Sequence, residues 1–326
     1  MRGSSTVDVF STTRKRPCGD SRPFRWRNTL SLGESAAGPP QLRTWPPRVQ
    51  APLGQPYHTW LTPQGERAAE FFRQGASYTV RFPAAADFVI SPDGRDVDRW
   101  AVPDANGWDL EALFLNQVTP LALSRQGRLV LHGSVVEVDG GCAAFVGHSG
   151  QGKSTLAASF AQEGASFLAD DGVQIRWVDG RAVVQPAHPF LRLAPDAREA
   201  LFAPDSLSPA SAGGSKLRVS AAQLPHCTAP RILRAVFFLD DRHSTVPKIA
   251  AISAREALVR LLQHSFMLDI EEADFLRAHF GELTTLAAQP LHFSLGFPRR
   301  FDCLPAVRTT LIRHLSLLDD HARNVL

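Results

Sequence analysis

The chain has 326 residues, a formal net charge of +3 and an ordinary globular composition, 44% hydrophobic and 21% charged. These values exclude a collagen-like, fully disordered or membrane-embedded chain, and the length allows one large domain or two small ones. No apolar run reaches the roughly 18 to 20 residues of a spanning helix, and no secretion signal opens the chain. The four cysteines form no CxxC pair, so we predict a reduced, cytoplasmic protein without zinc or membrane contact.

Positive charge is concentrated at the start of the chain, in residues 1–50, which carry nine Lys or Arg against three Asp or Glu. This segment is also rich in Ser, Gly and Pro and has no sustained hydrophobic period. We therefore predict a disordered basic tail over residues 1–50, with no specific nucleic-acid binding.

A small N-terminal α+β region is predicted over residues 51–127, packed on the core. Its strands are expected at Tyr78–Phe82, Asp87–Ile90 and Val97–Val102. Apolar residues at helical spacing predict a helix from Leu110 to Leu123, which Pro120 should kink or split and Gly127 should end.

Strands and helices alternate loosely from residue 128 onward, with hairpins between them, which predicts the α/β class with a mixed sheet. The expected strands are 129–131, 135–138, 142–146, 167–169, 173–178, 181–185, 235–239 and an edge-like strand at 291–295. The expected helices are 153–162, one that Ser253 and Glu256 cap, one near 271–280 and one at 305–318 that aligns Val307, Leu311 and Leu315.

Residues 147–154 fit the pattern G-x-x-x-x-G-K-[ST] in full, between a predicted buried strand and an amphipathic helix. Glycines let the backbone bend around a phosphate chain, and its N–H groups converge on anionic oxygens at a helix N-terminus. Lys153 is expected to reach the β- and γ-phosphates, and Ser154 to ligate Mg²⁺. The motif predicts ATP and Mg²⁺ as cofactors, contacted by Gly147, His148, Ser149, Gly150, Gln151, Gly152, Lys153, Ser154 and Thr155.

Two Asp pairs follow apolar strands, Asp170-Asp171 and Asp240-Asp241, and each could supply the carboxylates that phosphoryl transfer needs. The first pair starts seventeen residues after Lys153, enough for one helix and a return to the neighbouring strand. Ligands of parallel sheets sit beyond the carboxyl ends of adjacent strands, which favours Asp170-Asp171. The second pair stays open as an alternative to that site, or as a turn.

His132-Gly133, the hairpin Ser134–Val146, the glycine-rich loop and the run Phe167–Asp171 resemble, in order and spacing, the catalytic domain of HPr kinase/phosphorylase. The resemblance covers about residues 128–176 and includes the smaller HPr-kinase-like proteins, among them lasso-peptide precursor kinases. It implies a P-loop kinase domain over 128–326, with a core of the HPr kinase and phosphoenolpyruvate carboxykinase type.

The resemblance also implies an activity, the ATP-dependent phosphorylation of a Ser or Thr hydroxyl on an acceptor peptide or small protein. By position, Asp170 matches the base that takes the proton of the hydroxyl, and Lys153 and His132 complete the catalytic set. Asp171 matches a neighbour near the metal, together with Ser154.

The sequence departs from the HPr kinase pattern at two places, which limits the acceptor and the activity that the resemblance implies. His148 stands where HPr kinases have an acidic residue, and no E-[IL]-R-G-x-G-type sequence follows, so neither HPr as acceptor nor phosphorylase activity is expected. Further candidates for substrate or phosphate contact are Arg192, Lys216 and Arg218, whereas Arg299 and Arg300 are expected to be surface residues. A nucleotide-binding regulator with little turnover and a small-metabolite kinase stay open as alternatives, as does oligomerisation.

Overall fold

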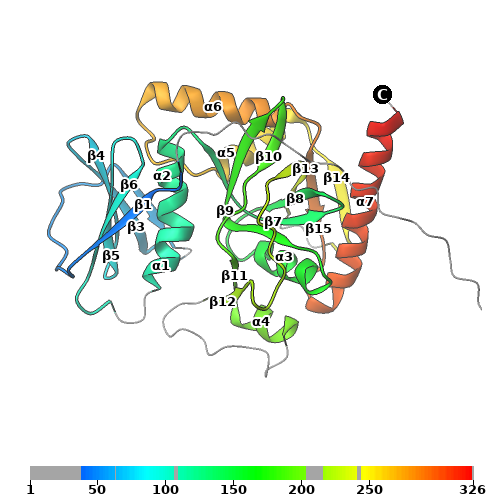
Figure 1. The fold of residues 1–326 in the computed structure, drawn as a ribbon, viewed down its shortest axis with the longest axis horizontal. Helices are drawn as coiled ribbons and strands as arrows, with labels where there is room; N and C mark the ends of the chain where they lie inside the picture. Colours follow the sequence, from blue (N-terminus) through cyan, green and yellow to red (C-terminus); the bar gives the residue numbers. More distant parts are fainter. Residues whose placement is uncertain (1–37, 63, 106–108, 203–215, 241–243, 325–326) are drawn as a thin grey trace, which may run out of the picture.

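The computed structural model describes residues 38–324, except 63, 106–108, 203–215 and 241–243. Figure 1 shows a smaller sheet on one side of α2 and a larger sheet, with its helices, on the other. This is the mixed α/β architecture predicted from the alternation of elements. None of the helices in the described part of the chain is long and apolar enough to cross a bilayer.

The smaller sheet is formed by residues 41–101 and is antiparallel except at one edge. Its spatial order is β1 (Gln41–Trp45), β6 (Asp96–Ala101), β5 (Ala86–Ile90), β4 (Ser77–Phe82), β3 (Arg67–Gln74) and β2 (His58–Leu61). The three predicted strands are confirmed as β4, β5 and β6. The strands β2 and β3 are additional, because the continuous buried run in β3 lacks the alternation of a one-sided strand.

The disordered tail predicted over residues 1–50 is too long, because its last ten residues include a strand. Residues 41–45 form β1, which pairs in parallel with β6 and sets Trp45 opposite Trp100. The two indole rings stack with centroids 6.1 Å apart, and Trp45 Nε1 donates to the Asp98 carboxylate at 2.8 Å. Average composition could not indicate this strand, because its partner lies 55 residues further along the chain. Residues 1–37 lie outside the described residues.

The helix predicted over residues 110–123 is present in three parts, α1 (Leu110–Leu113), a π-helical turn (Phe114–Val118) and α2 (Thr119–Arg125). Pro120 lacks an N–H and cannot donate back to the preceding turn, and the widened turn lies directly before it. Gly127 follows the helix at φ +77°, as the predicted stop requires.

The larger sheet has seven strands and carries the site. Its spatial order is β10 (Arg181–Val184), β9 (Phe167–Val178), β7 (Leu129–Val138), β8 (Gly141–Val146), β13 (Arg231–Leu239), β15 (His292–Gly296) and β14 (Lys248–Ala251). Parallel pairs join β8 to β13 and β13 to β15, and the other pairs are antiparallel. A separate two-stranded sheet pairs β11 (Phe190–Leu193) with β12 (Leu217–Ser220).

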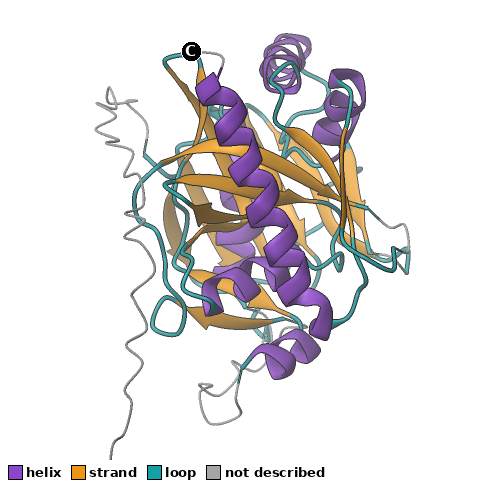
Figure 2. Ribbon diagram, turned by 90° about the vertical axis from the view of Figure 1, so that its right-hand side faces the viewer, coloured by secondary structure: helices purple, strands orange, loops and turns teal. Residues whose placement is uncertain are grey.

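Helices cover both faces of the larger sheet. One apolar cluster contains residues of α3 (Lys153–Gln162), α4 (Pro195–Leu201) and α7 (Leu304–Asn324), and the other contains residues of α5 (Ala254–Gln263) and α6 (Ala273–Ala287). Figure 2 shows α7 lying across the strands. The predicted apolar row of Val307, Leu311 and Leu315 is confirmed as buried, and Ser253 accepts the Glu256 N–H as a helix cap.

Four predictions about the larger sheet are wrong. The strands expected at 129–131 and 135–138 are one strand, β7, and the strand expected to end before Asp170 continues through it as β9. The strand near 291–295 is interior, because β14 pairs along its outer side. Finally, β9 does not neighbour the P-loop strand β8; β7 lies between them.

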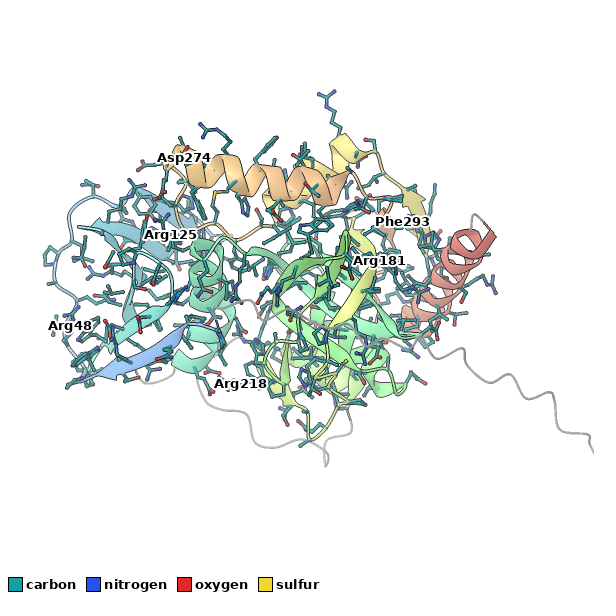
Figure 3. All side chains as sticks on the ribbon, turned by 45° about the horizontal axis from the view of Figure 1, so that its top comes forward. Arg48, Arg125, Arg181, Arg218, Asp274 and Phe293 are labelled. Atoms are coloured by element: carbon teal, nitrogen blue, oxygen red, sulfur yellow. The ribbon has the colours of Figure 1, made fainter. Side chains whose placement is uncertain are left out.

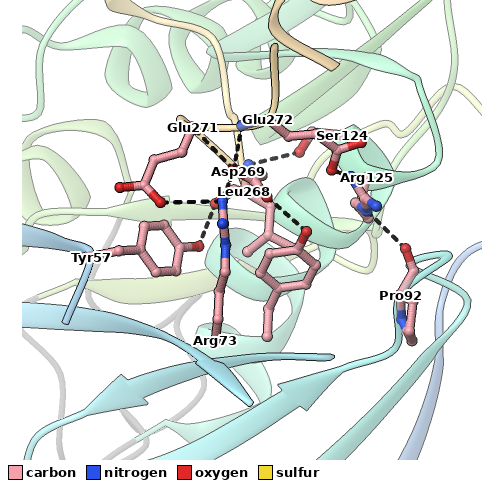
Figure 4. Close-up of polar contacts among 10 residues, drawn as sticks. Tyr57, Arg73, Pro92, Ser124, Arg125, Leu268, Asp269, Glu271 and Glu272 are labelled. Atoms are coloured by element: carbon pink, nitrogen blue, oxygen red, sulfur yellow. Dashed lines mark hydrogen bonds and ion pairs between the residues drawn. The ribbon is translucent and has the colours of Figure 1, made fainter. Parts of the chain in front are cut away.

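The segment 264–272, between α5 and α6, joins the two sheets. Its Phe266 and Leu268 belong to the apolar cluster of the smaller sheet, and the Leu268 N–H donates to Ser124 Oγ at 3.1 Å. The buried Asp269 accepts hydrogen bonds from Arg73 and Tyr78 of that sheet, as Figure 4 shows for Arg73. The smaller sheet is thus tied to a segment that begins beside the site described next.

Candidate active site

The glycine-rich loop follows β8 and opens α3, as its sequence predicts. Gly150 and Gly152 have φ values of +83° and +86°, a left-handed conformation that glycine adopts without strain. Gly152 precedes the first residue of α3, so the free N–H groups of the helix start point out of the loop. The loop therefore has the backbone form of a phosphate cradle.

The Lys153 side chain is buried and hydrogen-bonds to the backbone of the glycine-rich loop. Its Nζ donates to the carbonyls of Gly147 at 2.8 Å and His148 at 2.9 Å. Burial, with the charge of Lys216 second, lowers the pKa of Lys153 to about 8. Phosphate oxygens would offer this ammonium stronger, charged acceptors than the two carbonyls.

Antiparallel pairing of β7 with β9 builds the second side of the site. The register sets His132 opposite Gly172, Gly133 opposite Asp171, and Ser134 opposite Asp170. A Cβ on Gly133 would lie 2.8 Å from the Phe145 carbonyl oxygen of β8, so only glycine fits between these strands. Close backbone packing between β7 and β8 therefore explains the glycine of the His-Gly dipeptide.

Asp170 is 1% exposed and is fixed by three hydrogen bonds. Its Oδ1 accepts hydrogen bonds from the hydroxyls of Ser134 at 2.5 Å and Ser154 at 2.8 Å. Its Oδ2 accepts a hydrogen bond from the backbone N–H of Arg192 at 2.9 Å. Burial, and after it the neighbouring Asp171, raises the pKa of Asp170. Sequence reasoning expected Asp171 beside Ser154 and missed Ser134; the carboxylate that contacts Ser154 is that of Asp170.

Asp171 is also buried, but its carboxylate makes longer contacts. It lies 3.8 Å from Arg192 Nη1 and 3.9 Å from His132 Nδ1. The backbone of Asp171 has φ +61°, unusual for a residue within a strand, and it turns this side chain away from the regular alternation of β9. Neighbouring aspartates thus reach the same site from different directions.

Three histidines gather near the start of the loop. The backbone N–H of His132 donates to the backbone carbonyl of His264 at 2.6 Å, and the ring centres of His264 and His148 lie 4.7 Å apart. Burial lowers the pKa of His132 to about 3, with smaller contributions from Lys153 and Lys216. Burial likewise lowers the pKa of His264 to about 3, so both imidazoles are neutral at physiological pH. His264 had no signal in the sequence, because it lies far along the chain.

A cavity of about 500 Å³ adjoins the loop. It is lined by Gly150, Gln151, Gly152, Lys153, Ser154, Thr155, Arg192, Ala194, Asp196, Ala197, Lys216, Ser244, Phe297, Pro298, Arg299, Arg300, Phe301 and Leu304. Most of the predicted loop contacts, together with Arg192 and Lys216, therefore face one space. Gly147, His148 and Ser149 do not line it, although Gly147 and His148 hold Lys153.

Two arginines make contacts that the sequence did not indicate. Arg218 makes ion pairs with Asp109 at 2.5 Å and Glu111 at 2.8 Å, and it lies at the junction of the two parts in Figure 3. It therefore joins β12 to the start of α1, and it does not line the cavity beside the loop. Arg299 is exposed, as predicted, but it also lines the cavity and donates to the carbonyls of Gln151 and, at 2.8 Å, Asp240.

The structure also shows where the alternative pair, Asp240-Asp241, lies relative to the P-loop strand. β13, which ends just before Asp240, is the parallel neighbour of β8, so the rule of adjacent strands points to Asp240. Yet the carboxylate that contacts the loop serine belongs to Asp170. The sequence prediction thus chose the pair that touches the loop, for a topological reason that does not hold. Asp241 lies outside the described residues.

No family model and no curated protein matches this chain. Among solved structures, the chain is similar to the HPr(Ser) kinase/phosphatase from Coxiella burnetii, with 14% sequence identity, 59% of this chain and 98% of that chain covered, and a TM-score of 0.30. A similarity this distant carries no argument, so the interpretation of the site depends on its own residues.

Proposed function

We propose that the protein is an ATP-dependent kinase that transfers the γ-phosphate to a Ser or Thr hydroxyl of a peptide or small protein. The single observation that carries the proposal is the hydrogen bond between Ser154 of a complete phosphate-binding loop and the buried carboxylate of Asp170. P-loop enzymes hold Mg²⁺ between the loop Ser/Thr and such a carboxylate. The sequence resemblance to HPr kinases supports the choice of acceptor.

Ser154 and Asp170 fit a magnesium ion by the chemistry of their donors. Mg²⁺ prefers oxygen ligands and binds through one or two carboxylates together with phosphate oxygens and water. When bound there, Mg²⁺ neutralises charge on the β- and γ-oxygens during transfer. Ser134 and the Arg192 N–H hold the Asp170 carboxylate in place for this role.

Asp171 is the better placed of the two aspartates to act as base. The carboxylate of Asp170 is already occupied by three hydrogen bonds, whereas the contacts of Asp171 are at 3.8 and 3.9 Å. A base must keep a lone pair for the proton of the acceptor hydroxyl. We therefore assign the proton to Asp171 and the metal to Asp170, the reverse of the roles implied by the resemblance.

Lysine and arginine side chains supply the positive charge that transfer requires. Lys153 belongs with the β- and γ-phosphates, and Arg192 and Lys216 line the same cavity. Fixed cations in a water-poor site stabilise the charge that spreads over the transferred group. The neutral His132, beside Asp171, adds no charge and can hydrogen-bond the incoming hydroxyl.

The test is phosphate transfer from labelled ATP to a panel of Ser and Thr peptides, small proteins and small hydroxyl metabolites. We expect transfer to a peptide or protein, and a loss on the order of 100-fold or more in Lys153→Ala. Lys248→Ala is the matched control, since Lys248 lies on the edge strand β14. Phosphorylation of metabolites alone would instead show a small-metabolite kinase. Tight ATP binding without any turnover would show a nucleotide-binding regulator.

A further inference from the structure

The cavity beside the phosphate-binding loop has two unlike walls. Arg192 and Lys216 contribute to a basic wall, whereas residues 297–301 form an aromatic wall that carries Phe297 and Phe301 together with Arg299 and Arg300. Arg192 Nη1 lies 3.8 Å from the Asp171 carboxylate, and Lys216 is close enough to lower the pKa of Lys153. The basic wall therefore belongs to the reacting end of the site.

The loop itself sets the direction of a bound triphosphate. In the proposed ATP complex, Lys153 and Ser154 hold the terminal phosphates next to Asp170, which already contacts Ser154, and Thr155, one residue later, lines the cavity. Because the reacting end lies at the basic wall, the rest of a nucleotide must leave the loop towards the other wall. That wall consists of residues 297–301, between β15 and α7.

The aromatic wall is fastened to the loop through Arg299. Its guanidinium donates to the carbonyls of Gln151 and Asp240 and lies 4.3 Å from the centre of the Phe297 ring. Phe297 is buried beneath it, whereas Phe301, at the start of a short 3₁₀ turn (Phe301–Cys303), is 38% exposed. Phe301 therefore presents an aromatic face to the cavity, and Arg299 sets its distance from the loop.

We propose that residues 297–301 form the nucleoside-binding wall and that the base of the bound nucleotide stacks on Phe301. The inference rests on the proposed binding of ATP and names the side chains that bind its nucleoside end. Stacking of a base on an aromatic ring contributes substantially to affinity and is independent of the hydrogen-bonding edge of the base. Arg299 acts as a positioning residue that joins this wall to the loop.

The experiment compares ATP with inorganic tripolyphosphate, which has the phosphates but no base. Binding of each, with Mg²⁺, is measured by calorimetry for the wild type and for Phe301→Ala, Phe301→Leu and Phe301→Tyr. We expect Phe301→Ala and Phe301→Leu to weaken ATP binding about tenfold or more and to leave tripolyphosphate binding unchanged. Phe301→Tyr keeps the ring and should keep wild-type ATP affinity.

Phe280→Ala is the matched control, because Phe280 is a similarly exposed phenylalanine (49%) on α6, outside the cavity. Equal ATP affinity in the wild type and Phe301→Ala, or equal losses for ATP and tripolyphosphate, would overturn the stacking role while leaving ATP binding intact. Equal affinities of the Leu and Tyr variants would overturn it as well. A wild type that binds neither ligand would overturn the proposed function itself, and this inference with it.

Discussion

Asp170 and Asp171 are neighbours in the chain, yet the fold surrounds their carboxylates differently. One is held by Ser134, Ser154 and a backbone N–H, and the other faces His132 and Arg192. The left-handed backbone at Asp171 lets both carboxylates reach one site, because regular alternation would send adjacent side chains to opposite faces of the sheet. In the proposed mechanism, Asp170 can therefore hold the metal while its neighbour Asp171 acts as the base.

The first prediction separates these two roles. Asp171→Asn keeps the size and removes the proton acceptor, so ATP binding should survive while transfer falls by about 100-fold or more. Asp170→Asn should instead raise the Mg²⁺ concentration needed for half-maximal rate, because it weakens the metal site. Transfer rates over a magnesium titration measure both effects. The opposite pattern would restore Asp170 as the base.

The second prediction concerns the charge on Lys153. Because its pKa is lowered to about 8, much of this lysine is uncharged in the free protein near that pH. A bound triphosphate favours the charged form and raises the pKa, so binding at pH 8 should take up roughly half a proton. Calorimetry in two buffers of different ionisation enthalpy measures the uptake.

The control for this uptake is Lys153→Arg, whose guanidinium stays charged at every accessible pH. Any ATP binding by this variant should proceed without proton uptake. Identical binding heats for the wild type in both buffers at pH 8 would contradict the lowered pKa of Lys153. At pH 6, where Lys153 is fully charged in the free protein, its contribution to the uptake should vanish.

At the scale of elements, the site depends on how closely β7, β8 and β9 pack. β7 approaches β8 at a distance that only Gly133 allows, because the Phe145 carbonyl of β8 occupies the space of a Cβ. The loop extends from β8, on the other side of β7 from β9. A small displacement of β7 would therefore separate Asp170 from Ser154.

The third prediction is that Gly133→Ala lowers both stability and transfer. The added methyl must push β7 away from β8, at a cost of about 1–3 kcal/mol in the free energy of unfolding. Gly281→Ala is the matched control, since Gly281 lies in α6 with no atom within 4 Å of the added methyl, and alanine there should be neutral or stabilising. Denaturant titration measures the stabilities. Wild-type stability in Gly133→Ala would contradict the close packing.

At the scale of the whole molecule, the smaller sheet is connected to the active site by one continuous segment. Residues 264–272 start at His264, whose carbonyl accepts the backbone N–H of His132, and their Asp269 binds Arg73 and Tyr78 of the smaller sheet. Burial acts to raise the pKa of Asp269, but hydrogen bonds from the backbone N–H groups of Glu271 and Glu272 and from Tyr78, with the charge of Arg73, outweigh it and lower the pKa. Because the folded-state pKa is lowered, the stability from this carboxylate is present above its unfolded pKa and is lost as pH falls.

The fourth prediction tests where the folded body begins. Deleting residues 1–50 removes β1, together with the stacked Trp45 and the Gln50 side chain that donates to Asp87 at 2.9 Å. The thermal midpoint should therefore fall by several degrees. Deleting residues 1–37 should leave the midpoint unchanged if the predicted disorder holds there. Equal midpoints for both deletions would show that β1 contributes little.

Local chemistry by itself determined several parts of this protein. The loop 147–155 and its strand–helix context could be predicted because glycine conformation, a helix start and a lysine at fixed spacing act within nine residues. The stop at Gly127 and the cap at Ser253 are equally local. Apolar periodicity likewise indicated most helices and the strands that alternate on one face.

Only the tertiary structure decided how distant residues meet. Strand order placed β7 between β9 and β8, and this order brings Ser134 and Ser154 into hydrogen-bond contact with Asp170. Arg299 contacts the Gln151 carbonyl of the loop, 148 residues away in the sequence. Arg218 forms an ion pair with Asp109 at the start of α1. Such contacts arise from the packing of whole elements, and no local pattern records them. The residue types of the site could therefore be predicted from the sequence, whereas the division of roles among them could not.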